Sequence, residues 1–223
     1  MNAQDVLAIL EKLGKPQTAA IYKRYGAGEN VFGVLTSEIV RIRKKIRVDH
    51  ALAMELWETG NAEARVLALE IADPVRLTRA DADRLVKDGP VRFVGWYLSG
   101  LVGRSPIAEK TMYAWMKSRD EHFRELGYGI LGARLSADPD SISDADAGKV
   151  LTTIEKEIHR APNWVRYAMN SALISIGVFK PALRGKAMEA AGRIGKVEVD
   201  HGETYCKTPD AVSLLAKAKR RRR

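Results

Sequence analysis

The feature that most constrains this chain is the helical spacing of its apolar residues. Ile39, Ile42 and Ile46 follow an i, i+3, i+7 spacing, and the apolar residues at 151, 154 and 158 do the same. The spacing continues over three turns between residues 165 and 176, as a stripe suited to burial. No segment sustains a strict alternation of apolar and polar residues, which a half-buried strand would need. The sequence therefore predicts an all-α fold.

Prolines interrupt the periodic segments at positions 16, 74, 90, 106, 139, 162, 181 and 209. Proline lacks a backbone N–H and fixes φ, so it falls at helix starts and in turns. The wide spread of these prolines, mostly between periodic segments, predicts roughly a dozen helices and no linker. Residues that favour N-caps agree with this: Thr36 and Ser37 precede one basic segment, and Asp120 precedes a helix expected to run to about Leu135.

Two short motifs recur along the chain. Ala72-Asp73-Pro74 returns as Ala137-Asp138-Pro139, and Ala80-Asp81-Ala82 returns as Ala145-Asp146-Ala147, both at an offset of 65 residues. A helix pair exposes an apolar face that a stacked neighbouring pair can bury. Repetition at such a distance therefore favours an α-solenoid over a closed bundle.

Three arginines form a second recurring pattern. Arg92, Arg124 and Arg166 each lie 14 or 15 residues before a loop proline, and they are separated by 32 and 42 residues. These intervals fall within the range of helix-pair repeats. The arginines either contact phosphates or form ion pairs that brace adjacent repeats, and the sequence leaves both interpretations open.

Basic residues are concentrated in two places. The formal net charge is +9, and residues 217–223 hold six basic side chains, which leaves about +3 for the rest. We therefore expect one domain over residues 1–216 and a basic tail over 217–223. The second cluster consists of Arg41, Arg43, Lys44, Lys45 and Arg47. Such clusters attract phosphates whatever the base sequence, although a solubilising tail and a solvated helix face explain them equally well.

Composition indicates a cytoplasmic protein. The single cysteine, Cys206, excludes an intramolecular disulfide framework and fits a reducing compartment. No uninterrupted apolar run reaches 18 residues, and the N-terminus shows no basic segment followed by an apolar core. We expect no membrane span and no signal peptide.

Several blocks of residues resemble a known family. The blocks are YGAGENVFGV at 25–34, RIRK at 41–44, HALA at 50–53, LWETG at 56–60, EAR at 63–65, LA at 67–68, IGKVEVDHGET at 194–204 and CKTPDA at 206–211. Their succession resembles the bacterial DNA alkylation repair proteins, the HEAT-like repeat alkylpurine DNA glycosylase superfamily. The last two blocks look like a subgroup of that family.

The resemblance implies a HEAT-like α-superhelix that holds duplex DNA, alkylated or distorted, against a concave basic face. Active members hydrolyse the N-glycosidic bond of N3- and N7-alkylated purines. Alkylation already makes the purine a good leaving group, so the protein needs mainly a carboxylate that stabilises the cationic sugar and orients water. No metal or nucleotide cofactor is implied. We expect a monomer that is nucleoid-associated when bound to DNA.

The chain departs from the family where catalysis would occur. The resemblance places the catalytic aspartate at Gly95, or at Trp96 if the register slips by one. A family arginine and a family tryptophan fall near Leu126 and Ser171, again without a match. Asp88 is the one weak candidate for a substituting carboxylate. Glycosylase activity is therefore an open question.

The candidate DNA-binding residues combine the internal basic cluster, the three repeated arginines and one tryptophan. They are Arg41, Arg43, Lys44, Lys45, Arg47, Arg92, Trp96, Arg124 and Arg166. Trp96 lies in the segment that matches the active-site helix of the family and could line a DNA-facing groove. Trp57 and Trp115, at helical spacing, are expected in the core.

No metal site is predicted. Asp200, His201 and Cys206 lack the fourfold ligand set of a structural site. The aspartates between residues 138 and 146 are superficially similar to a calcium loop but have Ile142 where an oxygen ligand should be, so an inter-helix turn with helix caps is expected. Three functions remain open: an alkylpurine DNA glycosylase, a non-catalytic protein that binds duplex or branched DNA, and a protein–protein scaffold.

Overall fold

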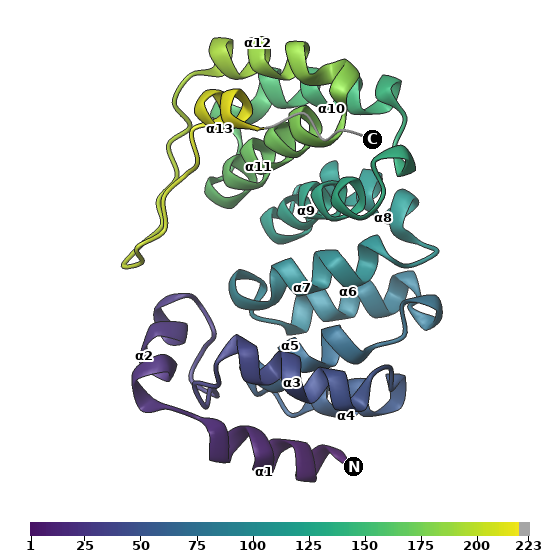
Figure 1. The fold of residues 1–223 in the computed structure, drawn as a ribbon, viewed down its shortest axis with the longest axis vertical. Helices are drawn as coiled ribbons and strands as arrows, with labels where there is room; N and C mark the ends of the chain where they lie inside the picture. Colours follow the sequence, from purple (N-terminus) through teal and green to yellow (C-terminus); the bar gives the residue numbers. More distant parts are fainter. Residues whose placement is uncertain (219–223) are drawn as a thin grey trace. The chain divides into compact units, whose positions relative to one another are not determined.

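The computed structural model describes residues 1–218, which form thirteen α-helices and four short 3-10 helices without a strand (Figure 1). This confirms the predicted all-α fold. Lys217 ends the last helix, and residues 219–223 of the predicted tail lie outside the described residues. No helix within residues 1–218 is long and apolar enough to cross a membrane.

The described residues group into two compact units. Unit 1 comprises Met1–Ala108 with Gly202–Thr204, and unit 2 comprises Glu109–His201 with the chain from Tyr205 onward. Unit 1 contains α1 (Ala3–Leu13), α2 (Pro16–Arg24), α3 (Thr36–Ile46), α4 (His50–Glu58), α5 (Ala62–Ile71), η1 (Pro74–Arg76), α6 (Arg79–Asp88) and α7 (Val91–Gly103). Unit 2 contains α8 (Ala108–Met116), whose first residue belongs to unit 1, α9 (Glu121–Ala137), η2 (Pro139–Ser141), α10 (Asp144–Glu157), η3 (Ile158–Arg160), α11 (Asn163–Phe179), η4 (Pro181–Leu183), α12 (Arg184–Ile194) and α13 (Ala211–Lys217). The single domain expected over residues 1–216 stays a prediction.

Helix starts follow the prolines, as predicted. Pro16 opens α2, and Pro90 and Pro162 are the N-caps of α7 and α11. Asp120 caps α9 by accepting hydrogen bonds from the backbone N–H groups of two residues in its first turn. The cap predicted at residues 36 and 37 is wrong, because Thr36 is already helical and the N-cap of α3 is Leu35, which makes no side-chain cap bond.

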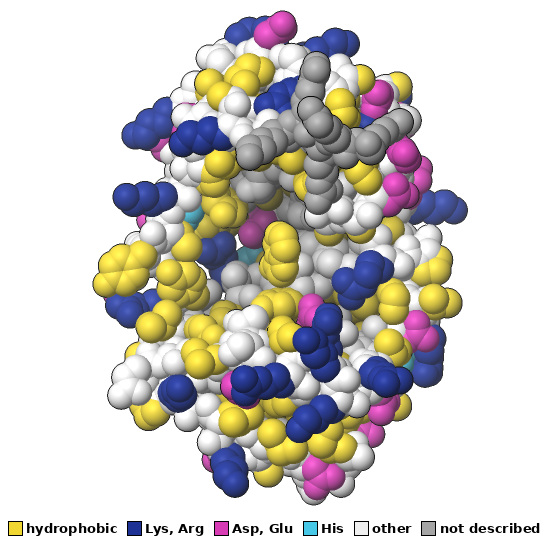
Figure 2. Space-filling view, viewed as in Figure 1, with side chains coloured by type: hydrophobic (Ala, Val, Ile, Leu, Met, Phe, Trp, Pro, Cys, Tyr) yellow, Lys and Arg dark blue, Asp and Glu magenta, His cyan; other side chains and the backbone are white. Residues whose placement is uncertain are grey.

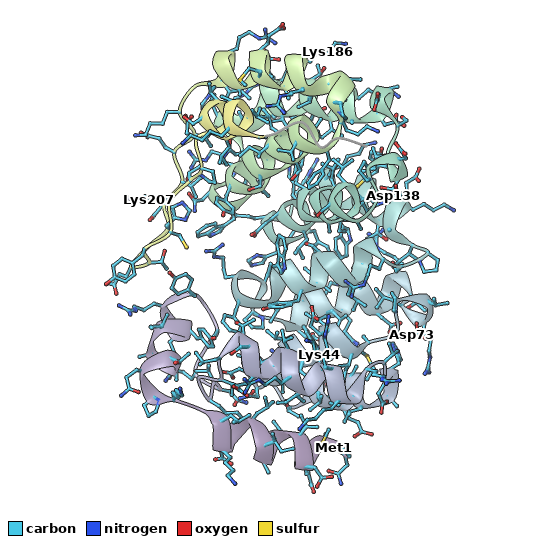
Figure 3. All side chains as sticks on the ribbon, in the orientation of Figure 1. Met1, Lys44, Asp73, Asp138, Lys186 and Lys207 are labelled. Carbon is cyan, nitrogen blue, oxygen red and sulfur yellow. The ribbon has the colours of Figure 1, made fainter. Side chains whose placement is uncertain are left out.

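The motif that repeats at an offset of 65 residues builds the same turn in both units. Asp73 and Asp138 each accept a hydrogen bond of 3.0 Å from the backbone N–H two residues on, at the starts of η1 and η2 (both labelled in Figure 3). Thr78 and Ser143 then cap α6 and α10. The internal repeat is thus a structural repeat of a turn, a short 3-10 helix and a capped helix.

Unit 1 is organised around the buried helix α5, which packs against α3, α4 and α7. Glu63 in this helix has no exposed surface, yet no cation pairs with it among the described residues. Its carboxylate accepts three backbone hydrogen bonds, from Phe32 N (3.1 Å), Gly33 N (2.6 Å) and Val34 N (3.1 Å). A carboxylate satisfied by three N–H donors is stable in a core. Glu63 therefore fixes the segment between α2 and α3.

Gly33 is required at the centre of this segment. Its φ is +83°, and a Cβ at this position would lie 2.2 Å from the carbonyl oxygen of Lys15. The segment that precedes α3 therefore lies directly against the backbone of the first turn of α2.

In unit 2 the most extensive packing is between α9 and α11, and α11 also packs against α10, α12 and α13. Trp57 in unit 1 and Trp115 in unit 2 are each 1% exposed, which confirms that both lie in the core.

The aspartate-rich turn at residues 138–144 holds an ammonium group. Lys180 is only 6% exposed, and its Nζ donates to the carbonyl oxygens of Pro139 (3.0 Å) and Ile142 (2.9 Å). The same Nζ lies 2.7 Å from Asp144 Oδ1. Of the aspartates in the calcium-like spacing, Asp144 bonds Lys180 and Asp138 caps η2, so the prediction of an inter-helix turn with caps is confirmed.

Candidate nucleic-acid interface

The basic cluster of the sequence lies on the solvent-facing side of α3. Ile39 and Ile42 are buried, whereas Arg41, Arg43, Lys44, Lys45 and Arg47 are all exposed. Lys44 is labelled on this helix in Figure 3. The amphipathic spacing that buries the isoleucines necessarily turns the cations outward. Figure 2 shows lysine and arginine side chains dispersed over the visible face of unit 1 among hydrophobic and neutral surface, without a continuous basic patch.

Two of the five cations in this cluster form ion pairs. Arg41 bonds Glu38 at 2.9 Å, and Arg43 bonds Glu70 of α5 at 2.7 Å. Lys44, Lys45 and Arg47 form no ion pair with any residue between 1 and 218. These three cations are therefore the part of the cluster that is available to phosphates. They also lie at the end of α3, where positive charge favours the helix terminus, so a structural contribution is expected as well.

The aromatic cavity is a hollow of about 270 Å³ in unit 1, between α2, α3, α5 and α7. Its lining residues are Ile21, Tyr22, Tyr25, Thr36, Ile39, Val66, Arg92, Phe93 and Tyr97. The rings of Tyr22 and Phe93 lie 5.0 Å apart at 54°. Burial raises the pKa of Tyr97, while a hydrogen bond with the Thr36 side chain acts in the opposite direction. The cavity is mainly aromatic, and Arg92 is the one charged residue in its wall.

Trp96 lies on the same helix as the cavity wall and is exposed. It follows Arg92 by one turn and precedes Tyr97, and 83% of its surface is accessible. An indole usually contributes to stability through burial. A tryptophan so exposed beside an aromatic cavity offers a flat face for stacking with a base or for contact with a sugar.

Among residues 1–218, no carboxylate lines the aromatic cavity. Gly95 and Trp96, where the family resemblance places the catalytic aspartate, provide none. Asp88 ends α6, is exposed, lies 3.6 Å from Arg84 in an ion pair, and does not line the aromatic cavity. A carboxylate that acts as a general base or an electrostatic stabiliser must lie within hydrogen-bond reach of the reacting group, and no described residue in the wall of this cavity supplies one.

The repeated arginines of unit 2 have different surroundings. Arg124 lies on α9 and forms a 2.5 Å ion pair with Glu157 of α10, with only 20% of the arginine side chain exposed. This pair braces adjacent helices, as one of the two interpretations expected. Arg166, at the same place in α11, has no ion pair and no hydrogen bond among residues 1–218, and its Nε is buried without an acceptor.

Arg166 lines a second, larger hollow, the arginine cavity, with a volume of about 760 Å³. The wall consists of Asn163, Arg166 and Asn170 of α11, residues 195–200 and residues 208–211. All of these belong to unit 2. Its wall is polar and includes carboxylates, in contrast to the wall of the aromatic cavity.

Sequence reasoning missed the residues that complete both cavities. Tyr22 and Tyr25 flank two cations in the stretch Tyr22-Lys23-Arg24-Tyr25, and aromatics interleaved with basic residues were a usable signal for a nucleic-acid surface. Asn163 and Asn170 share a helical spacing with Arg166, which the sequence did single out, but nothing local indicates that a connection 37 to 39 residues away covers the two asparagines.

Comparison with known proteins identifies the family. Residues 6–213 match the model of the DNA alkylation repair enzyme family. The chain belongs to this family. Uncharacterised proteins of Listeria innocua and Listeria monocytogenes are each 28% identical to it, and the alignments cover 95% of this chain and 95% of each relative.

A solved structure of another protein is similar to this chain in fold. It comes from a family of proteins related to the HEAT-like repeat DNA glycosylases with affinity for branched DNA structures. The match has a TM-score of 0.90 at 30% sequence identity and covers 97% of this chain and 93% of the other. The fold is therefore a HEAT-like helical-repeat fold, which confirms both the family resemblance and the predicted fold class.

Proposed function

We propose that this member of the DNA alkylation repair family binds DNA with unpaired or distorted regions, branched DNA in particular, and does not excise alkylated bases. The observation that carries the proposal is the aromatic cavity with Trp96 exposed beside it and no carboxylate in its wall. Aromatic faces stack on bases that have left the duplex, and stacking does not depend on base identity. The structural neighbour with affinity for branched DNA supports this interpretation.

Affinity in this proposal comes from two sources. Lys44, Lys45 and Arg47 supply electrostatic attraction to phosphates, which lowers the dissociation constant at low salt for any DNA. Trp96 and the tyrosines of the aromatic cavity supply the preference for bases that are not stacked in a duplex. Arg92 contributes positive charge to the aromatic cavity, while Arg41 and Arg43 are partly neutralised by Glu38 and Glu70.

The test compares two assays on the full chain. Mobility shifts on a three-way junction, a four-way junction and a linear duplex of equal length should show tighter binding of the junctions. Methylated duplex should release no 7-methylguanine or 3-methyladenine above a control without protein. Equal affinity for junction and duplex would refute the preference, and accelerated release of either base would refute the non-catalytic assignment. A scaffold without DNA affinity would show no shift at low salt.

A further inference from the structure

A second ligand site lies in unit 2, at the arginine cavity. Asn163, Arg166 and Asn170 lie three and four residues apart on α11, so their side chains share one face of that helix. The connection between α12 and α13 passes over this face in two arms, residues 195–201 and 205–210, which are visible as the long loop beside α13 in Figure 1. The cavity is the space between the face and the two arms.

The two asparagines fix the arms. Asn163 Nδ2 donates to the carbonyl oxygen of Asp200 at 2.8 Å, and the backbone N–H of Asp200 donates back to Asn163 Oδ1 at 2.8 Å. Asn170, which is 2% exposed, donates to the carbonyl oxygen of Pro209 at 2.9 Å. Both arms are thus attached to α11 at defined points, and the cavity keeps its shape without a ligand.

Arg166 lies between the two asparagines and does not bond to the connection. Its Nε is buried without an acceptor among residues 1–218, as is the Nε of Arg124, but Arg124 has an ion-pair partner in Glu157 and Arg166 has none within these residues. The carboxylates in the wall have other partners. Glu198 bonds Lys196 at 3.0 Å, and Asp210 accepts a hydrogen bond from Ser213 N at 2.7 Å as the N-cap of α13. The hydrogen bond from Lys196 and, to a lesser extent, the positive charge of Arg166 lower the pKa of Glu198. No hydrogen bond or ion pair within residues 1–218 is described for the guanidinium of Arg166, so its outer nitrogens can donate to a ligand in the cavity.

The residues in the wall of the arginine cavity indicate which class of ligand it can bind. A guanidinium fork binds phosphate oxygens in a bidentate manner. A phosphate alone would leave most of a 760 Å³ cavity empty, whereas a nucleotide approaches the size of ligands found in pockets of this volume. Glu198, Asp200 and Asp210 line the same cavity and would repel a run of several phosphates.

We infer that the arginine cavity binds one unstacked nucleotide, with its phosphate on Arg166 and its base against the polar groups of the connection. The inference rests on the proposed function, since branched DNA exposes nucleotides that have left the stack and these cost least to extract. A free mononucleotide offers the same chemistry as a nucleotide in a strand, so the test uses both.

The experiment compares the wild-type chain with Arg166→Gln and with the charge-matched control Arg193→Gln. Arg193 lies in the same unit, on α12, and forms an exposed ion pair with Glu155. Ligand-observed NMR with the four deoxynucleoside monophosphates should detect binding to the wild type and to R193Q. The affinity of R166Q should be roughly ten- to a hundredfold lower, as expected for the loss of charge-assisted hydrogen bonds. Deoxynucleosides, which lack the phosphate, should bind more weakly than monophosphates.

In the same experiment, R166Q should lose roughly tenfold affinity for a three-way junction and less than threefold for linear duplex. The melting temperature of R166Q should stay close to that of the wild type, because within residues 1–218 only the electrostatic attraction to the exposed Glu198 is lost. Arg166→Lys, which keeps the charge but not the fork, should bind mononucleotides with intermediate affinity.

Two results would overturn the inference while leaving the proposed function intact. One is junction binding by R166Q at wild-type affinity together with no mononucleotide binding by the wild type, which would mean that water satisfies Arg166. The other is an equal loss for junction and duplex in both R166Q and R193Q, which would reduce Arg166 to an unspecific surface charge. Absence of any DNA affinity in the wild type refutes the proposed function itself.

Discussion

The aromatic cavity of unit 1 is lined by three tyrosines, a phenylalanine and an arginine, whereas the wall of the arginine cavity of unit 2 is formed by amides, carboxylates and backbone groups. The first can hold a base or sugar by its faces, and such contacts tolerate any sequence. The second can hold a nucleotide by its edges and its phosphate. Helices of the same repeat type thus form two cavities with different binding properties. The difference comes from the side chains that neighbouring segments contribute to each wall.

The difference also bears on catalysis. Excision of an alkylated purine needs a group that stabilises positive charge on the sugar, and only the arginine cavity has carboxylates in its wall. Those carboxylates share the wall with Arg166 and Lys196, and Glu198 bonds Lys196 at 3.0 Å. The fold of the DNA alkylation repair family is retained here, while the carboxylate expected on α7 is missing.

The largest expected effect is the absence of base excision by the wild-type chain. Removing one preorganised stabilising group from an active site typically lowers the rate by about 10²–10³. We expect the wild-type chain to release no alkylpurine faster than a control without protein, measured as free base from methylated duplex. Gly95→Asp should restore a small rate if the register of the resemblance is right. Asp88→Asn should change nothing, because Asp88 is exposed and paired with Arg84; a wild-type excision rate that falls in this variant would identify Asp88 as the catalytic base.

The next effect tests stacking at the aromatic cavity. Trp96→Ala should lower the affinity for junctions and single strands by roughly 5- to 150-fold, since stacking of an aromatic ring on a base contributes about 1–3 kcal/mol. Affinity for linear duplex should change little, and so should the melting temperature, because 83% of Trp96 is exposed. Val75→Ala, another exposed apolar residue of unit 1, is the matched control. A parallel loss for junction and duplex would assign Trp96 a role unrelated to unpaired bases.

A smaller effect is expected from the exposed cations of α3. Replacing Arg43, Lys44 and Lys45 with alanine should weaken binding to all DNAs and flatten the plot of log K against log salt, by roughly 0.9 for each phosphate that the variant no longer neutralises. Most of the change should come from Lys44 and Lys45, because Glu70 already pairs with Arg43. Fluorescence anisotropy over a salt series measures the slope. A slope that equals that of the wild type would place this face of α3 away from DNA.

The sequence predicted the elements of this fold better than it predicted its cavities. Helical spacing, prolines and the cap at Asp120 depend on local interactions, and each was confirmed. The repeated Ala-Asp-Pro motif correctly indicated a repeated turn, because the aspartate bonds a backbone group two residues away. The cap expected at Thr36 failed because propensity alone does not decide where a helix begins.

The candidate site depends on contacts between distant segments. Asn163 meets Asp200 across 37 residues, and Lys180 reaches a turn about 40 residues before it. Arg124 and Arg166 have the same place in the repeat, yet only Arg124 meets a carboxylate, because Glu157 follows on α10. Periodicity therefore located these arginines, but it could not show which one forms an ion pair with a neighbouring helix and which one does not.

The smallest expected effect concerns the basic tail. Arg184 donates from Nη2 to the carbonyl oxygens of Leu215 and Ala218, the latter at 2.7 Å, and so satisfies the end of α13. Leu215 is fully buried, and its side chain packs against Gly177 of α11. Within residues 1–218, these contacts attach α13 to the rest of unit 2. Deleting residues 220–223 should leave the melting temperature nearly unchanged, while DNA affinity falls because four positive charges are lost.

Arg184→Ala provides the control for this deletion. Losing the cap of α13 should lower the melting temperature by about 2–4 °C for each kcal/mol of unfolding free energy that is lost. DNA affinity should change little if α13 stays packed against the rest of unit 2. Calorimetry and anisotropy on both variants separate the two roles. If the truncated chain no longer unfolded cooperatively, the last four arginines would be part of the fold, and the independence of the tail from unit 2 would be disproved.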